Sequence, residues 1–173
     1  MNDQLGDKIP YILDGGDCDV GLESTIIGFI DKEPEIFRLG GIPVEDIETI
    51  VGKVNVRLHS SSHPEAPGLL ESHYAPLKKV KLRDNAVMAD TSDPGEIGLI
   101  RFKEIDPSVP EKNQIILSRN GDLIEAAKNL FSALRKMDEM DVKYVVAESL
   151  PEKGLGRAIN DRLRRAAAVN RRY

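Results

Sequence analysis

The sequence predicts an α/β protein whose second half is a small parallel-sheet domain. Within residues 81–173, short apolar strands alternate with amphipathic helices, an order typical of parallel sheets joined by right-handed crossovers. Within residues 1–58, β-branched runs are broken by glycine pairs, a pattern that favours short strands and tight turns. Residues 59–80 lie between them, have no usable period and are rich in serine and proline, so they are predicted to be a linker.

The first section is predicted to contain a hairpin and one short helix. Residues 25–30 and 35–39 are expected to be strands, with Pro34 helping to end the first of them. Pro43 is placed to open a helix at its first position, and Gly52 to close it. One face of that helix is expected to carry Val44, Ile47 and Val51.

The last section is predicted to be Rossmann-like and to fold on its own. Its expected strands are residues 86–89, 97–100, 114–117 and 144–147. Asp122 followed by Glu125 resembles a capping box that opens a long helix. A last helix is expected after Gly154, with an apolar face made of Leu155, Ala158, Ile159, Leu163 and Ala166.

Composition limits the classes of function. The formal charge is -5, which disfavours a bulk electrostatic grip on nucleic acid, although a local basic patch remains compatible with it. The single cysteine, Cys18, can form neither an intrachain disulfide nor a metal site by itself. We find no signal-peptide pattern and no apolar run of the roughly 20 residues that a membrane helix needs, so we expect a cytoplasmic protein with no membrane partner.

Two polar positions in the first section are candidates for binding an anion. Ser24 and Thr25 stand side by side where a glycine-rich turn meets a strand, and hydroxyls with turn amides can hold a phosphate or carboxylate. Arg38 interrupts an apolar strand just before a glycine pair, and its planar fork suits the same ligands. The alternatives are a hydroxyl pair that merely begins a strand and a surface arginine.

A stiff loop in the linker is a candidate lid. His73 and Tyr74 lie between Pro67 and Pro76, and a rigid loop that presents these side chains can close over a site. The alternative is a spacer whose aromatic ring packs on a domain surface. The other histidines fit no metal-binding spacing, so no metal site and no metal-bound cofactor are predicted.

The last helix is strongly basic on its polar face. Glycines at its start can expose amides to an anion, and its arginines can contact RNA phosphates. We favour the simpler interpretation of a solvated face, because Arg157, Asp161 and Arg165 follow one another at the spacing of helical ion pairs.

Taken together, three blocks of sequence resemble the two-domain, YrdC-like threonylcarbamoyl-AMP synthases. The residues of the first block run from Asp14-Gly15-Gly16 through Glu23-Ser24-Thr25 to Arg38-Leu39-Gly40-Gly41, and they are similar to the closing half of the YrdC-like domain. Ala66-Pro67-Gly68 with His73-Tyr74-Ala75-Pro76 resembles the family's linker. The run from Gly154-Leu155-Gly156 to Arg165-Ala166-Ala167 resembles the C-terminal domain.

The resemblance implies an activity and roles for particular residues. Family members join L-threonine, bicarbonate and ATP, with Mg²⁺, into threonylcarbamoyl-AMP and pyrophosphate, for the modification of tRNA. By the same resemblance, Ser24 and Thr25 lie in the substrate cleft, Arg38 faces the nucleotide, and His73 and Tyr74 lie across the cleft. No residue of this chain is assigned a catalytic role.

The chain is expected to be a truncated member of that family. The family's basic signature stands upstream of the Asp-Gly-Gly turn, where this sequence has only a short stretch. We therefore expect a chain that is inactive alone and forms a homo-oligomer through the incomplete domain of residues 1–58. The alternatives are a module that binds tRNA or double-stranded RNA, and a nucleotide-binding regulatory module.

Overall fold

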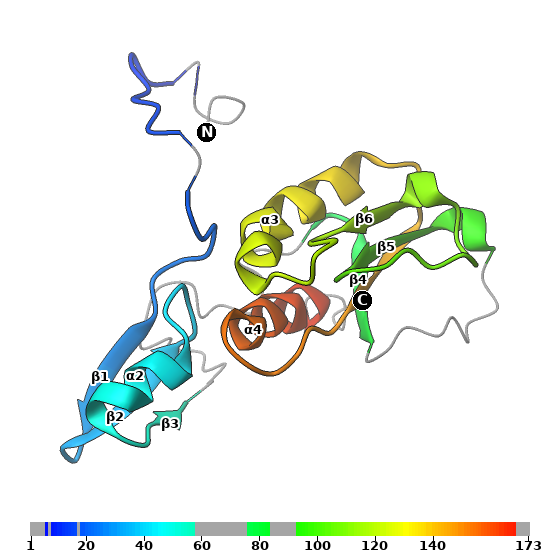
Figure 1. The fold of residues 1–173 in the computed structure, drawn as a ribbon. Coiled ribbons are helices and arrows are strands. Elements are labelled where there is room, and N and C mark those ends of the chain that lie inside the picture. Colours follow the sequence, from blue (N-terminus) through cyan, green and yellow to red (C-terminus); the bar gives the residue numbers. More distant parts are fainter. Residues whose placement is uncertain (1–5, 7, 17, 58–75, 84–92, 169–173) are drawn as a thin grey trace.

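The computed structural model contains two separate sheets, one in each half of the chain (Figure 1). The first sheet has three strands and the second has four. The strand expected at residues 86–89 and the loop that carries His73 and Tyr74 lie outside the described part of the chain. The described residues are 6, 8–16, 18–57, 76–83 and 93–168.

The first sheet is built on the expected hairpin. Strand β1 (Ile26–Ile30) pairs antiparallel with β2 (Glu33–Arg38), and a short strand, β3 (Asn55–Val56), which the sequence did not predict, pairs parallel with β2. The turn is tighter than expected. Asp31 and Lys32, with φ values of 50° and 71°, form a two-residue connection of the left-handed kind that matches strand twist.

The prediction that Pro34 ends the first strand was wrong, because Pro34 lies inside β2 and pairs with Phe29. Strand β3 reaches only Glu35 and Ile36, so β2 has a neighbour on one side alone at Pro34. A strand position with one neighbour tolerates the missing backbone N–H of proline.

Helix α2 (Val44–Val51) follows the sheet and ends at Gly52, whose φ of 79° suits glycine. Pro43 was expected at the first helical position, but it is the N-cap, one residue before the helix begins. Val44 is buried, but Val51 is 45% exposed and does not share the buried face as the spacing predicted. The small core that α2 helps to form is Ile36, Leu39, Val44 and Val54, together with Ala158 from the last helix.

The described residues cover one face of the first sheet only in part, around the buried Ile36. Ile27 and Phe29 of β1 are 41% and 70% exposed, and Val56 of β3 is 37% exposed. Apolar side chains gathered on one sheet face are typical of a surface that another element or chain covers. The expected homo-oligomer stays a prediction.

The second sheet is fully parallel, as the alternation of strands and helices predicted. Its order is β4-β7-β5-β6, with parallel pairing at every interface. The sequence did not predict β4, which begins two residues before position 81, the expected start of this domain. The strands are β4 (Lys79–Arg83), β5 (Ile97–Arg101), β6 (Gln114–Ile116) and β7 (Tyr144–Glu148), and short 3-10 turns at Pro94–Glu96 and Glu111–Asn113 precede β5 and β6.

Helices α3 (Leu123–Glu139) and α4 (Leu155–Ala168) share the main core on one face of this sheet. Strand residues of that face are Val80, Ile100, Val145 and Ala147. The opposite face is covered by a loop through Val109, which packs on Ile97, Leu99 and Val146. Because β5 has covered faces on both sides, its first four residues are all buried and do not alternate.

The long helix begins at Asp122, as predicted, but its cap has three members. The Asp122 carboxylate accepts a hydrogen bond from the Ile124 amide at 2.7 Å. Glu125 does not close a capping box directly. The Ser118 hydroxyl accepts from the Asp122 amide at 2.8 Å and bonds the Glu125 carboxylate, so a serine stands between the two members of the box.

We expect residues 76–173 to fold without the first section. They contain the whole second sheet and nearly all of the main core, and removing residues 1–75 exposes mainly the polar side chains of α4, which water can solvate. The isolated segment should therefore show one cooperative thermal transition by circular dichroism. A broad, non-cooperative melt would contradict this.

Candidate functional site

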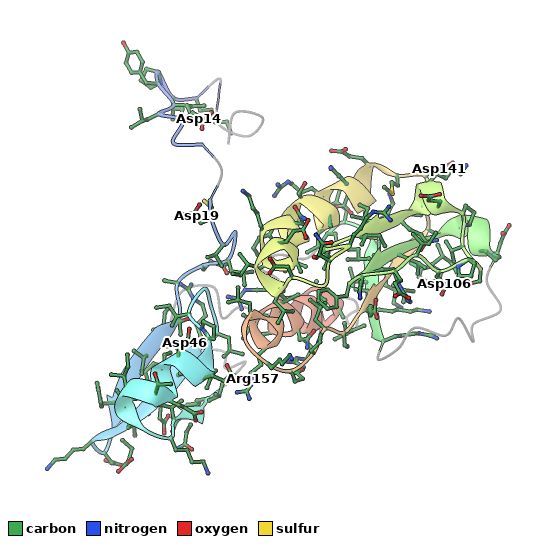
Figure 2. All side chains as sticks on the ribbon, viewed as in Figure 1. Asp14, Asp19, Asp46, Asp106, Asp141 and Arg157 are labelled. Carbon is green, nitrogen blue, oxygen red and sulfur yellow. The ribbon has the colours of Figure 1, made fainter. Side chains whose placement is uncertain are left out.

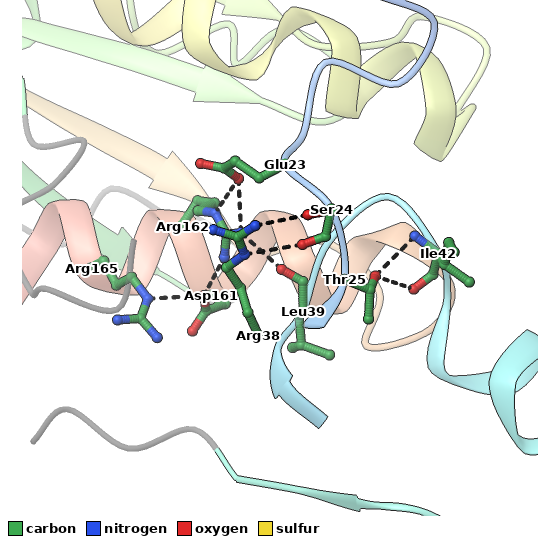
Figure 3. Close-up of polar contacts among 9 residues, drawn as sticks. All are labelled: Glu23, Ser24, Thr25, Arg38, Leu39, Ile42, Asp161, Arg162 and Arg165. Carbon is green, nitrogen blue, oxygen red and sulfur yellow. Dashed lines mark hydrogen bonds and ion pairs between the residues drawn. The ribbon is translucent and has the colours of Figure 1, made fainter. Parts of the chain in front are cut away.

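The three predicted binding residues of the first section lie together beside β1 and β2 (Figure 3). Arg38 ends β2, and its guanidinium donates from Nε to the Ser24 carbonyl oxygen and from Nη2 to the Ser24 hydroxyl, each at 3.0 Å. The Ser24 residue is exposed, whereas Thr25 and Arg38 are partly buried. The hydroxyl pair and the arginine therefore form one accessible polar cluster, which we call the Ser24–Arg38 cluster.

Thr25 differs from Ser24 in that its hydroxyl bonds the backbone of another stretch of the chain. Its hydroxyl donates to the Ile42 carbonyl at 2.8 Å and accepts from the Ile42 amide at 3.0 Å. The Gly41 amide donates to the Glu23 carbonyl at 2.8 Å. Two stretches, residues 23–25 and 38–42, are thus joined along their length, and Thr25 fixes their shape.

These two stretches touch at the level of the backbone. A Cβ atom on Gly40 would lie 2.3 Å from the Glu23 carbonyl oxygen and 2.4 Å from the Thr25 nitrogen. No side chain fits there, so glycine at position 40 is what allows the chains to meet. The close approach brings the end of β2 against the residues that lead into β1.

A buried arginine from the C-terminal domain holds both stretches. Arg162 of α4 has no exposed surface. Its guanidinium donates to Glu23 Oε2 from Nε at 3.0 Å and from Nη2 at 2.8 Å, and Nη2 also donates to the Leu39 carbonyl oxygen at 2.8 Å (Figure 3). A buried guanidinium is tolerated only when its donors find partners, and these three bonds supply partners for Nε and Nη2.

The prediction that the basic face of the last helix is solvated was wrong for its central residues. Asp161 and Arg165 are only 5% and 8% exposed. The Asp161 carboxylate accepts from Arg165 Nε at 2.9 Å, as the helical spacing predicted, and it also accepts from Arg162. Arg164 does lie at the surface, paired with Glu152 at 3.0 Å.

The glycines at the start of α4 meet an anion from the protein itself. The Gly154 amide donates to the Glu45 carboxylate of α2 at 3.3 Å, and Arg157 lies 3.6 Å from the same carboxylate oxygen. A Cβ on Gly156 would stand 2.0 Å from the Pro151 carbonyl oxygen, so this glycine serves a tight turn. The exposed anion site considered at this helix is thus replaced by a second contact between the two halves.

Sequence reasoning missed Arg162 and Glu23, although a signal was present. Arg162 follows Leu155 by seven residues and Ile159 by three, which places it inside the apolar face of the helix. An arginine on an otherwise apolar face needs a buried carboxylate or carbonyl partner. The pattern does not say which acidic residue is the partner, and the structure shows that it is Glu23.

Other polar features lie apart from the cluster. A cavity of about 430 Å³ between Cys18, Gly21 and the exposed side of α3 includes none of Ser24, Thr25 and Arg38 in its lining. The pKa of Asp106 is lowered by the Ser108 hydroxyl that donates to it, and Asp106 lies at the far side of the second sheet (Figure 2). The pKa of Lys143 is raised by the adjacent Glu96. Neither titrating group belongs to the site.

The described residues were considered for two further features, a group of metal ligands and a helix that spans a membrane. Within the described ranges, no group of three or more histidine, cysteine or acidic residues is placed to hold a metal ion. None of the helices in the described part of the chain is both long and apolar enough to cross a membrane.

Comparison with known proteins identifies the family. Residues 42–168 match the family model described as threonylcarbamoyl-AMP synthase, C-terminal domain. The chain is 34% identical to the threonylcarbamoyl-AMP synthase of Pyrococcus abyssi over 92% of its own length and 50% of the relative's. It is 36% identical to the Schizosaccharomyces pombe enzyme of the same name, over 97% of its own length and 47% of the relative's.

The fold agrees with that assignment. The crystal structure of P. abyssi Sua5 complexed with L-threonine matches 96% of this chain and 52% of the solved one, with a TM-score of 0.79 and 31% identity. The chain spans about half the length of the curated relatives it matches. By family model, sequence and structure, this chain belongs to the threonylcarbamoyl-AMP synthases, of which it carries the C-terminal domain.

Proposed function

We propose that this chain forms one side of the substrate cleft of a threonylcarbamoyl-AMP synthase and acts together with the family's other half. The observation that carries the proposal is the Ser24–Arg38 cluster, an accessible group of anion-binding side chains in a chain of this family. The reaction is that of L-threonine, bicarbonate and ATP, giving threonylcarbamoyl-AMP and pyrophosphate for tRNA modification in the cytoplasm. Mg²⁺ enters with ATP as part of the substrate.

The cluster suits phosphate or carboxylate recognition. The Ser24 hydroxyl accepts from Arg38 Nη2, which leaves its own hydrogen to donate to a substrate oxygen. Arg38 is fixed against the Ser24 backbone, so its charge is already oriented before a nucleotide arrives. Preorganised donors of this kind lose no reorganisation energy at the moment of reaction, which is how such sites stabilise developing charge.

Threonine is the best supported of the proposed substrates. P. abyssi Sua5, whose fold covers nearly all of this chain, has been solved with L-threonine bound. ATP and bicarbonate are proposed from the family's reaction. The three substrates are proposed together because threonylcarbamoyl-AMP contains parts of L-threonine, bicarbonate and ATP.

The RNA-binding alternative gains little from the basic face of the last helix. Arg162 and Arg165 are buried in ion pairs with Glu23 and Asp161. A buried guanidinium cannot contact an RNA phosphate. The RNA-binding and regulatory-module alternatives both stay predictions, and no contact of the described residues favours either.

We expect this chain alone to release no pyrophosphate above background from ATP, threonine and bicarbonate. The resemblance places the family's basic cluster outside this sequence, and losing one preorganised contact to a transition state already costs ~10²–10³ in rate. Adding the N-terminal half of the P. abyssi enzyme should restore turnover. Robust activity of the chain alone would contradict the proposal.

Replacing Arg38 should impair the restored activity. Arg38→Gln removes the charge and the fork, so kcat/KM for ATP should fall ~10²-fold or more. Arg57→Gln is the matched control, since Arg57 follows the same sheet but pairs with Glu35 at 2.8 Å, away from Ser24. Equal effects of the two variants would show that Arg38 contributes only general charge.

Tyr74 tests the lid. In the restored enzyme, Tyr74→Ala should slow formation of threonylcarbamoyl-AMP without lowering the melting temperature, because a lid excludes water without supporting the core. The measurement is the initial rate of product formation beside a thermal melt. Unchanged kinetics would reduce the loop around Tyr74 to a spacer.

A further inference from the structure

Arg162 of α4 makes a contact that a purely structural ion pair does not need. A single nitrogen, Nη2, donates both to Glu23 Oε2 and to the Leu39 carbonyl oxygen, each at 2.8 Å. Glu23 precedes Ser24 in the chain, and Leu39 follows Arg38. Both partners of this nitrogen are therefore direct neighbours of the Ser24–Arg38 cluster.

The guanidinium is itself held from the other side. Arg162 Nη1 donates to the Asp161 carboxylate, which also accepts from Arg165 at 2.9 Å, so the fork cannot swing away from Glu23. Helix α4 in turn is anchored in the main core through Ile159 and Leu163, both with no exposed surface. The position of Nη2 is thus set by the C-terminal domain.

From this geometry we propose that Arg162 is a positioning residue for the substrate site: it fixes the distance and angle between Ser24 and Arg38 through Glu23 and Leu39. The inference rests on the proposed function. Arg162 has no exposed surface, so it touches no substrate and acts only through its neighbours. The C-terminal domain then contributes to the reaction by aligning the cleft.

The geometry of the two joined stretches shows why the hydrogen bonds of Arg162 to Glu23 and Leu39, which we call the clamp, matter. Arg38 reaches Ser24 with two hydrogen bonds of 3.0 Å, and both end on one residue of an otherwise irregular segment. The Gly41–Glu23 and Thr25–Ile42 hydrogen bonds join this segment to residues 38–42, but they do not fix the Glu23 side chain, and the segment that carries Ser24 can still shift unless that side chain is held. A displacement of about 1 Å at a reacting group can cost ~10²-fold in rate. Arg162 removes this freedom from both sides at once.

The first test uses the ¹⁵N-labelled chain alone. Arg162→Lys keeps the positive charge beside Glu23 but lacks the planar fork that serves Glu23, Leu39 and Asp161 together. The control is Arg164→Gln, on the same helix, where the lost partner is the exposed Glu152 at 3.0 Å. Both are compared with the wild type at a temperature where circular dichroism shows all three fully folded.

We expect Arg162→Lys to shift or broaden the Arg38 Nε–H resonance and the amide resonances of Thr25 and Gly41, and Arg164→Gln to leave them in place. Wild-type resonances in folded Arg162→Lys would overturn the inference. Should Arg162→Lys not fold, Glu23→Gln replaces it, since this change keeps the size of the side chain and weakens the same clamp from the other end. The same resonances and the same criterion apply.

The second test restores activity with the N-terminal half of the P. abyssi enzyme. Folded Arg162→Lys should lower kcat/KM for pyrophosphate release by ~10-fold to ~10²-fold, and Arg164→Gln should change it less than about 2-fold. Combining Glu23→Gln with Arg162→Lys should cost no more than the larger single effect, because both break one clamp. Wild-type kinetics in folded Arg162→Lys would overturn the positioning role.

The two tests separate this inference from the proposed function. A restored wild-type enzyme that releases no pyrophosphate would remove the synthase proposal, while the resonances of Arg38, Thr25 and Gly41 would still decide whether Arg162 positions the cluster. Active wild type with unperturbed resonances and kinetics in the variant would remove the inference and leave the synthase proposal standing.

Discussion

One buried guanidinium links the first section of the chain to the C-terminal domain. Arg162 lies on the apolar side of α4 and places its buried charge between Asp161 and Glu23, whose side chains are 6% and 23% exposed. Desolvating such a group is expensive, and removing one partner of a buried ion pair typically costs about 3–5 kcal/mol. The contact of the first section with the C-terminal domain therefore depends on keeping every partner of this arginine.

The rest of the interface is arranged around that contact. Ala158 of α4 completes the small core beneath α2, and Leu22 packs against both hydrophobic cores. The Glu45 carboxylate accepts a hydrogen bond from the Gly154 amide at the start of the same helix. The ion pairs determine the register in which the surfaces meet, because a shift would leave buried charges without partners.

Sequence periodicity predicted the secondary structure well wherever one face of an element is buried by its own domain. Strands β5, β6 and β7 and both long helices fell where short apolar runs and helical spacing placed them. Strands β3 and β4 were missed. The first has only two residues, too few for any pattern. The second does carry the alternation of charged and apolar residues that is typical of a strand, but it stands directly after the linker and was not recognised.

Sequence reasoning proposed the members of the candidate site and missed the residue that supports them. Ser24, Thr25 and Arg38 were singled out from residue type and position, and the fold brings them together. Their support comes from Arg162, more than a hundred residues further along the chain, and an ion pair over that separation has no local signature. The basic helix was therefore interpreted as solvated when its central charges are buried.

The clamp also makes the two halves of the chain thermodynamically dependent on each other. Coupling between two sites is reciprocal. If the C-terminal domain orders Ser24 and Arg38, a ligand bound at these two residues stabilises α4 by the same free energy. A ligand that engages the cluster would then slow hydrogen exchange at amides of α4, more than a hundred residues further along the chain. The C-terminal helix would thus report whether a ligand is bound at the Ser24–Arg38 cluster.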